Sequence, residues 1–250
     1  MAAALPGFPT TRCSALLGAR SDDAALRQRS WTALTAAYWK PAYKHVRVRW
    51  RKPREDAEDL TQAFFERAME RDFFARYEPE RARFRTFFRV CLDRFVSNAE
   101  KARTREKRGG ARALALDFDA AEAELASAGP STPEDLFDRE WKRSIFSLAI
   151  DALRAQCDRD GKSPAFRAFE RYDLADPDAR PTYDAIAGEL GVPATTVTNH
   201  LAWARRELRR LVIEELAGVT ASPGELHREA QVLLGPSLGN ETPAPRGAGR

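Results

Sequence analysis

Apolar residues recur at three- and four-residue spacing through most of the chain, and the strict alternation that marks a β-strand is nowhere sustained. This spacing places apolar side chains on one face of a helix. The pattern therefore predicts an all-α protein. The expected helical segments are residues 26–50, 56–76, 84–106, 136–157, 183–190 and 195–217.

A break in the helical pattern separates two halves of the chain. The stretch GGARALALDFDAAEAELASAGPSTP is rich in Ala, Gly, Ser and Pro and acidic in its middle, which is typical of a linker. Thr132-Pro133-Glu134-Asp135 then supplies an N-cap residue, a proline at the first helical position and early acids. We therefore expect a new domain to begin there, so that two helical domains are joined by a flexible acidic linker.

The expected divisions follow from this break. A short last helix is also expected, because Ser222-Pro223-Gly224-Glu225 has the spacing of a capping box. The residues after Gly235 carry too little apolar surface to fold. The divisions are an N-terminal extension (1–21), a first domain (22–108), a linker (109–131), a second domain (132–217) and a largely disordered C-terminal extension (218–250).

Composition places the chain among globular proteins. Its 250 residues are 43% hydrophobic and 31% charged, which leaves room for two sizeable cores. No apolar stretch approaches the roughly 20 residues that cross a bilayer, and MAAALPGFPT lacks the basic start and apolar run of a signal peptide. We therefore expect a cytoplasmic protein without a membrane partner. Cys13, Cys91 and Cys157 show no C-x-x-C spacing and are expected to be reduced thiols.

Basic residues are concentrated in two runs. The formal net charge is only +4, but residues 81–108 contain ten basic and three acidic residues. A second run, ARRELRR, ends at Arg210. Such runs are found both on solvated helix faces and on phosphate-binding surfaces, so charge alone leaves both interpretations open.

Catalytic and metal-binding signatures are not found in the sequence. None of the three histidines follows a Glu by three residues, as a carboxylate-bridged metal site in a helical bundle requires. Gly161-Lys162-Ser163 resembles the end of a P-loop, but no strand precedes it and Gln156 occupies the position of the first glycine. We expect no cofactor, no metal and no enzymatic activity. A hydrolase site assembled from distant carboxylates stays a weaker alternative.

Residues 182–210, TYDAIAGELGVPATTVTNHLAWARRELRR, have the spacing of a helix-turn-helix. Ala187 is a small residue where two helices meet, Gly191 can adopt a left-handed turn, and Val197 would anchor the second helix. A helical hairpin that never meets DNA is the alternative. The second helix favours DNA binding, because short polar and basic side chains suit base edges and phosphates. The residues expected to contact DNA are Thr195, Thr196, Thr198, Asn199, His200, Arg205 and Arg206.

The order of these segments resembles a known family. DAEDLTQAFFERAMER, FRTFFRVCLDRFVSNAEKARTREKRGG and TYDAIAGELGVPATTVTNHLAWARREL resemble regions 2.2, 2.3 to 2.4 and 4.2 of the bacterial sigma-70 family of RNA polymerase sigma factors. Within this family the chain resembles the extracytoplasmic-function subfamily. FPTTRCSALL and the pattern that runs from RFRTFF to KRGG resemble a subgroup common in planctomycete-type genomes. It covers roughly residues 8–217. It implies a transcription initiation factor with a helical bundle in region 2 and a helix-turn-helix in region 4.

The resemblance also implies a partner for the acidic helix. In the family, region 2.2 docks on the clamp coiled coil of the polymerase β′ subunit. The acids would meet a basic coiled coil. Phe65 lies at the edge of the apolar side of the expected helix 56–76, and it is expected to stay partly exposed as an apolar contact. The residues carried over to this surface are Asp56, Asp59, Leu60, Gln62 and Phe65.

Promoter contacts are implied for both halves. The second half would contact the −35 element through the helix-turn-helix. The first half would contact the −10 element through Arg85, Arg89, Arg94, Asn98, Lys101, Arg103 and Arg105. The chain departs from the family at two places. Many members have an Asn and then an Asp where this chain has Arg94 and Asn98, and they often have basic residues where it has Thr198 and His200. These departures bear on the promoter sequence.

Other partners and classes remain open. In relatives the linker threads the RNA channel of polymerase, but an ordinary solvated tether accounts for its acids equally well. An anti-sigma factor is a further candidate partner. The leading alternative from another class is a helix-turn-helix regulator that acts without polymerase.

Overall fold

Helices form every regular element in the part of the chain that the structure describes, and no strand occurs there, which confirms the predicted all-α fold. The computed structural model describes residues 18–19, 21–70, 73–103, 116–127, 129 and 131–235. Within these ranges no helix has the length and apolarity of a membrane span. The elements are α2 (Ala24–Arg49), α3 (Arg54–Glu70), η1 (Phe73–Arg76), α4 (Phe84–Arg103), α5 (Phe118–Ala126), α6 (Pro133–Arg159), α7 (Ser163–Asp173), η2 (Pro177–Ala179), α8 (Tyr183–Leu190), α9 (Ala194–Val219) and α10 (Pro223–Leu234).

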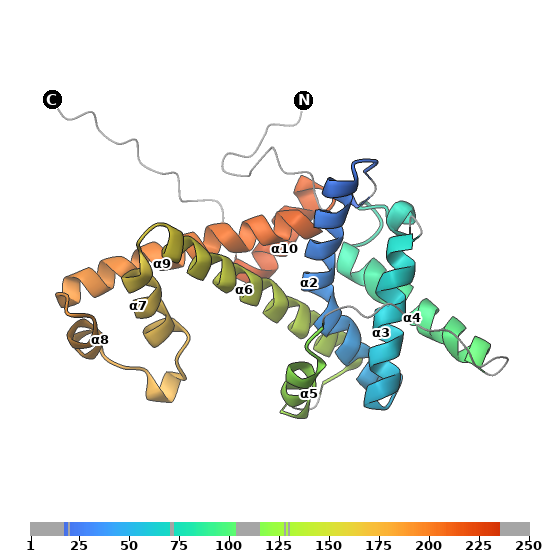
Figure 1. Ribbon diagram of the computed structural model, residues 1–250, viewed down its shortest axis with the longest axis horizontal. Helices are drawn as coiled ribbons and strands as arrows, with labels where there is room; N and C mark the ends of the chain where they lie inside the picture. The colour runs from blue at the N-terminus through green and yellow to red at the C-terminus, as the bar shows by residue number, and fades with distance from the viewer. Residues whose placement is uncertain are drawn as a thin grey trace.

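Two long helices, α2 and α6, cross in the middle of the molecule and pack on each other more extensively than any other pair. In Figure 1, α3 and α4 lie on one side of α2, whereas α9 runs along α6 with α7 and α8 at its far end. The buried apolar side chains of both halves form one core cluster. The expected division into two tethered domains is therefore not confirmed, because α6 buries its apolar side against α2.

An aromatic core joins α2, α3 and α4. Tyr38 stacks on Phe88 with ring centroids 4.5 Å apart, and Phe64 meets the edge of the same ring at 5.2 Å. Phe84 meets the edge of Tyr38 at 5.5 Å. All four side chains are almost fully buried. Because burial of one such ring contributes roughly 1.5–3 kcal/mol, this cluster fixes the position of α4 on α2.

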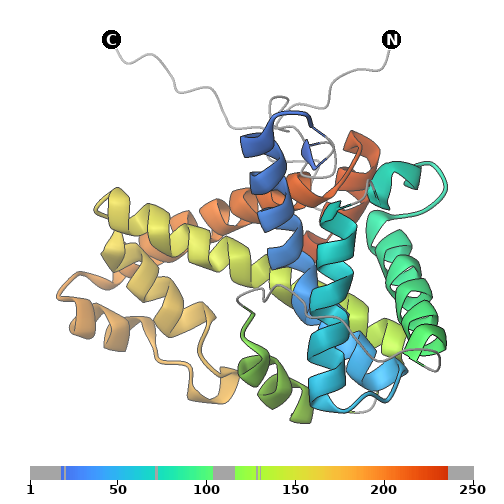
Figure 2. The same ribbon diagram turned by 45° about the vertical axis from the view of Figure 1, so that its right-hand side comes forward.

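Part of the expected linker is a helix. Residues 118–126 form α5, which begins after Asp117, whose carboxylate accepts a hydrogen bond from Ala120 N at 3.0 Å. Figure 2 shows α5 (green) beside the lower part of α2. Phe118 and Ala121 are buried there. The expectation of a flexible tether is therefore wrong for these residues, because the acids in this stretch pair with basic side chains of α2 and α3.

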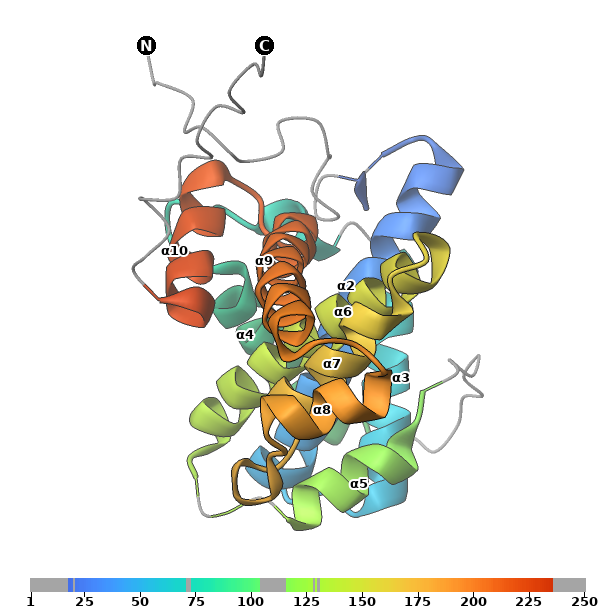
Figure 3. The ribbon, with the colours of Figure 1, turned by 90° about the vertical axis from the view of Figure 1, so that its left-hand side faces the viewer.

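The C-terminal helix α10 joins the end of α9 to the start of α4. Ser222 caps α10 by accepting a hydrogen bond from Glu225 N at 3.2 Å, as its sequence predicts. Figure 3, which looks along α9, shows α6 and α10 on either side of that helix. Glu225 is buried and accepts hydrogen bonds from Phe84 N at 2.6 Å and from the Tyr77 hydroxyl at 2.8 Å. The extension 218–250, expected to be largely disordered, is thus ordered as far as Gly235, and the residues after it lie outside the described part.

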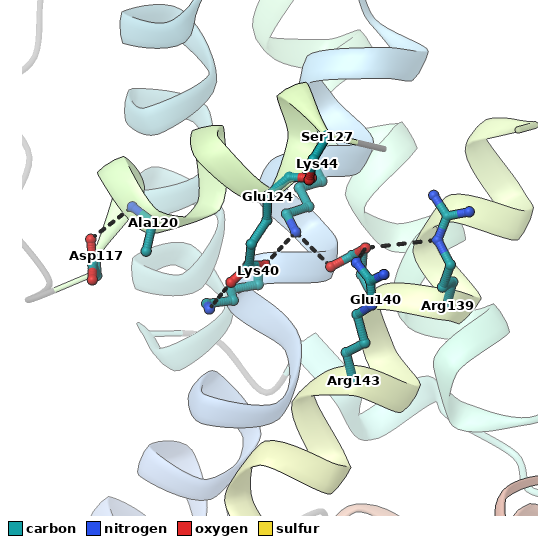
Figure 4. A network of polar contacts seen from close by, with 9 residues as sticks. All are labelled: Lys40, Lys44, Asp117, Ala120, Glu124, Ser127, Arg139, Glu140 and Arg143. Atoms are coloured by element: carbon teal, nitrogen blue, oxygen red, sulfur yellow. Dashed lines mark hydrogen bonds and ion pairs between the residues drawn. The ribbon is translucent and has the colours of Figure 1, made fainter. Parts of the chain in front are cut away.

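A buried lysine connects α2, α5 and α6. Lys44 is 0% exposed, and its ammonium lies 2.5 Å from Glu140 Oε2 and 2.6 Å from Glu124 Oε2. Glu140, which is also buried, accepts a further hydrogen bond from Arg143 at 2.8 Å. Figure 4 shows this network. A buried ammonium needs such partners, because an unpaired charge in the interior costs several kcal/mol.

Replacing Lys44 with Met should destabilise the protein by about 3–5 kcal/mol, because Glu140 is then left buried with its main partner removed. The double variant Lys44→Met/Glu140→Leu should recover most of this loss, since two apolar side chains of similar size replace the pair. Urea unfolding measures both. A single variant as stable as the wild type, or a double variant no better than the single one, would contradict this role.

Candidate nucleic-acid interface

The helix-turn-helix predicted from spacing is present in α8 and α9. Thr182 caps α8 by accepting a hydrogen bond from Ala185 N at 3.2 Å. Gly191 ends the helix with φ of 66°, a left-handed conformation that glycine adopts without steric cost. Val192 N then donates to Ala187 O at 3.1 Å. The buried side chains inside the motif are Ile186, Ala187, Val197, Leu201 and Ala204.

One face of α9 is open to a ligand. Thr195, Asn199 and Arg206 are four and seven residues apart, so they lie on the same side of the helix, and all three are exposed. Thr198 is also exposed, while Thr196 and His200 are half-buried. The face therefore exposes an amide and short hydroxyl side chains, with a guanidinium two turns further along, and these are groups of the kind that contact base edges and phosphates.

Arg205, which is expected to contact DNA, pairs with an acidic residue of the protein itself. Its Nε and one terminal nitrogen donate to the two carboxylate oxygens of Asp173, each at 2.9 Å. This bidentate hydrogen bond raises the pKa of Arg205 and joins α9 to the end of α7. Arg205 is half-exposed but engaged within the protein, which leaves Arg206 as the stronger candidate for a phosphate contact.

The exposed side of α4 carries part of the surface that is predicted to contact the −10 element. Arg94, Asn98 and Lys101 are exposed and are four and three residues apart, which places them on one side of the helix. Arg89 is half-buried. The Arg103 side chain and all of Arg105 lie outside the described residues. The structure thus brings together three of the residues predicted for this surface.

Arg85, which is predicted to contact DNA, is buried in the structure and exposes almost no surface for such a contact. Its side chain is 6% exposed, and its guanidinium lies 5.0 Å from the centroid of the Trp141 ring. Its Nε lies 3.3 Å from Glu229 Oε1. Burial raises the pKa of Glu229, although Arg85 and Arg83 lower it. The partner Glu229 comes from α10, more than a hundred residues away in sequence, so the pattern within α4 could not reveal this contact.

An open pocket of about 480 Å³ lies beside the exposed side of α4. Trp50, the residue that ends α2, forms one side of it and was missed by the sequence analysis. No local signal marks Trp50, because it reaches the pocket only through the packing of α2 on α4. The lining residues are Trp50, Asp93, Arg94, Ser97, Asn98 and Lys101.

Hydrogen bonds orient the groups at the base of this pocket. The Trp50 indole Nε1 donates to Asp93 Oδ1 at 2.8 Å, and His45 Nε2 lies 3.0 Å from the same oxygen. Burial raises the pKa of Asp93, but the bonds from His45 and Trp50 outweigh it, so the net shift is downward. The carboxylate therefore stays ionised and fixes the orientation of the indole ring.

The predicted polymerase surface on α3 is polar rather than apolar. Phe65 is 0% exposed, with ring centroids 5.6 Å from Phe64 and 5.9 Å from Phe88, so the expectation that it stays partly exposed is wrong. Leu60 is also buried. Because α3 packs against both α2 and α4, its buried arc is wider than one neighbour would require. Asp59 is exposed, and Asp56 and Gln62 are half-buried.

The described ranges contain no group of three His, Cys, Asp or Glu residues placed to bind a metal ion. Comparison of the chain with protein-family models, with curated proteins and with solved structures finds no match. The sequence motifs and the geometry of the surfaces on α3, α4 and α9 are therefore the features that bear on function.

Proposed function

We propose that this protein is a cytoplasmic sigma factor that binds core RNA polymerase and directs promoter recognition and transcription initiation. The observation that supports the proposal is that two surfaces with side chains suited to nucleic acid lie on one helical scaffold. One is the open face of a helix-turn-helix on α9, and the other is the pocket between Trp50 and α4. The first suits duplex DNA and the second suits an unpaired base.

At the −10 element the pocket would take a base of the opened strand. The Trp50 ring offers a stacking surface, and the Asn98 amide can both donate to and accept from a base edge. Arg94 and Lys101 flank them and suit the phosphates on either side. The chemistry is therefore binding of a strand that is already unpaired, without a catalytic step.

At the −35 element α9 would enter the major groove. Asn199 is exposed in the part of the helix that reads bases, and an Asn amide pairs with the N6 and N7 edge of adenine. Arg206, two turns further along, would contact phosphate and contribute affinity that does not depend on sequence. This division assigns specificity to the N-terminal half of α9.

Polymerase binding would rest on α3. Asp59 is exposed on this helix, with Asp56 and Gln62 beside it, and acids on such a face complement the basic coiled coil that the family resemblance implies. Because Phe65 is buried, the interface would depend on charge more than on an aromatic contact. Its affinity should therefore fall with added salt.

One observation favours the second candidate, a helix-turn-helix regulator that acts without polymerase. The burial of Phe65 removes the apolar contact that the polymerase surface was expected to present. Such a regulator would need the α9 face but not α3. Polymerase binding therefore distinguishes the two.

Purified core RNA polymerase should bind the protein, and Asp59→Arg should weaken this binding about tenfold, because the substitution reverses a charge that faces the basic partner. Asp151→Arg is the matched control, since Asp151 is an exposed acid on α6, away from α3. Binding can be measured by fluorescence anisotropy of the labelled protein. Failure of the wild-type protein to bind polymerase would exclude a sigma factor. Equal losses in the two variants would remove the assignment to α3.

Trp50→Ala should weaken binding of the polymerase complex to forked promoter DNA with a single-stranded −10 element by roughly 5- to 100-fold, the range for loss of one stacked base. Trp50→Phe should retain most of the affinity, because it keeps an aromatic face and loses the same bond to Asp93. Fully duplex DNA serves as the comparison in a filter-binding assay. Equal effects of Ala and Phe, or an equal loss on duplex DNA, would show that Trp50 does not stack on a base.

A further inference from the structure

Helix α5 covers a face of α2 on which aromatic and basic side chains alternate. Trp39 and Tyr43 are four residues apart, and Lys40 and Arg47 flank them on the same side of the helix. Arg54, at the start of α3, continues the basic row. This set of five side chains is called the covered face.

Every side chain of the covered face contacts α5. The Phe118 ring lies 5.7 Å from Trp39 and 4.9 Å from Tyr43, measured between centroids. The acidic side chains of α5 contact the basic side chains and the Tyr43 hydroxyl. The contacts are Lys40 with Glu124 at 2.8 Å, Arg47 with Glu122 at 2.6 and 3.0 Å, Tyr43 with Glu122 at 2.5 Å, and Arg54 with Asp119 at 2.5 Å.

The helix that makes these contacts is short and weakly anchored. Within its nine residues only Phe118 and Ala121 are buried, and isolated helices of this length are not stable in water. Glu124 pairs with the buried Lys44, and Glu122 accepts a hydrogen bond from Tyr43. The other contacts are partly exposed ion pairs, which are individually weak and screened by salt. The pairing with Arg47 lowers the pKa of Glu122, consistent with a contact that needs both charges. Helix α5 can therefore be displaced by a polyanion that satisfies the same groups.

The groups on the covered face match single-stranded nucleic acid. Such a strand carries negative charges along its backbone and flat rings that stack on aromatic side chains, and the face offers cations beside Trp39 and Tyr43. Trp50 is not part of the covered face. Its indole bonds the same oxygen of Asp93 on α4 that His45 contacts, whereas Tyr43 faces α5.

An open cleft extends the covered face beyond the end of α5. A cleft of about 520 Å³ adjoins the end of α5, where Lys40 and Ser127 meet Arg143 and two serines of α6. Lys40, Ser127 and Arg143 are seen together in Figure 4. The Lys44 ammonium behind them keeps Glu140 as a partner whether or not Glu124 is present. Displacement of α5 would therefore leave the core pairing intact.

We propose that the covered face is a second binding surface for single-stranded nucleic acid and that α5 occupies it as an acidic substitute for the strand. The contacts of α5 support this surface independently of the function proposed above. An acidic segment of another protein would satisfy the cations as well. The two aromatic rings beside the cations favour the strand, because bases stack on such rings.

The test uses the full chain without polymerase, so its failure is distinct from failure of the proposed function. In the opened variant Phe118→Ala/Asp119→Asn/Glu122→Gln/Glu124→Gln, binding of a fluorescent oligothymidylate of about 12 nucleotides should tighten at least about tenfold. Asp22→Asn/Glu134→Gln/Asp151→Asn makes the same change in charge at exposed sites away from α5 and should change binding less than about twofold.

Adding Lys40→Gln and Arg47→Gln to the opened variant should abolish the gain, because these cations would contact the phosphates. No gain beyond the charge control, or a gain that persists in this combined variant, would overturn the proposal. So would capture of a peptide of residues 116–127 without binding of the oligonucleotide. If urea unfolding shows that the opened variant has lost the cooperative transition of the wild type, Glu122→Gln alone replaces it, and an affinity equal to that of the wild type then overturns the proposal.

Discussion

The buried ammonium of Lys44 is the interaction on which the arrangement of the helices depends. It pairs with Glu140 of α6 and Glu124 of α5 where α2 and α6 cross, and these two helices pack on each other more extensively than any other pair in the described residues. A charge in this position tolerates few alternative registers, because sliding α6 along α2 would separate it from Glu140. The crossing in turn determines where α9, which packs along α6, lies relative to α4.

This scaffold separates the two candidate DNA surfaces. In Figure 1 the helix-turn-helix and α4 lie toward opposite ends of the long axis, with α6 and α9 between them. Helix α10 adds a second connection, since Glu225 and Glu229 meet the first turn of α4. In the proposed function, each surface alone would bind DNA weakly, and polymerase would bring both onto one promoter, where effective concentration raises affinity and specificity.

Features decided by neighbouring residues could be predicted from the sequence. The turn at Gly191, the caps at Thr132 and Thr182 and the start of α10 at Ser222 each depend on a few adjacent positions, and the structure has all of them. Burial of Phe65 and Arg85 could not be predicted in this way. Phe65 is covered because two helices flank α3, and Arg85 because α10 packs on α4 from the far end of the chain. Trp50 and the partners of α5 were missed for the same reason, since their roles arise from contacts between distant segments.

The central claim is that promoter recognition requires both DNA surfaces together with polymerase. The most direct measurement is a footprint on a promoter selected from random-sequence DNA by the protein in complex with core RNA polymerase, made with and without polymerase at one salt concentration. The account predicts specific protection of two separated elements only when polymerase is present. Strong sequence-specific protection by the protein alone would contradict it and would support a regulator that acts without polymerase.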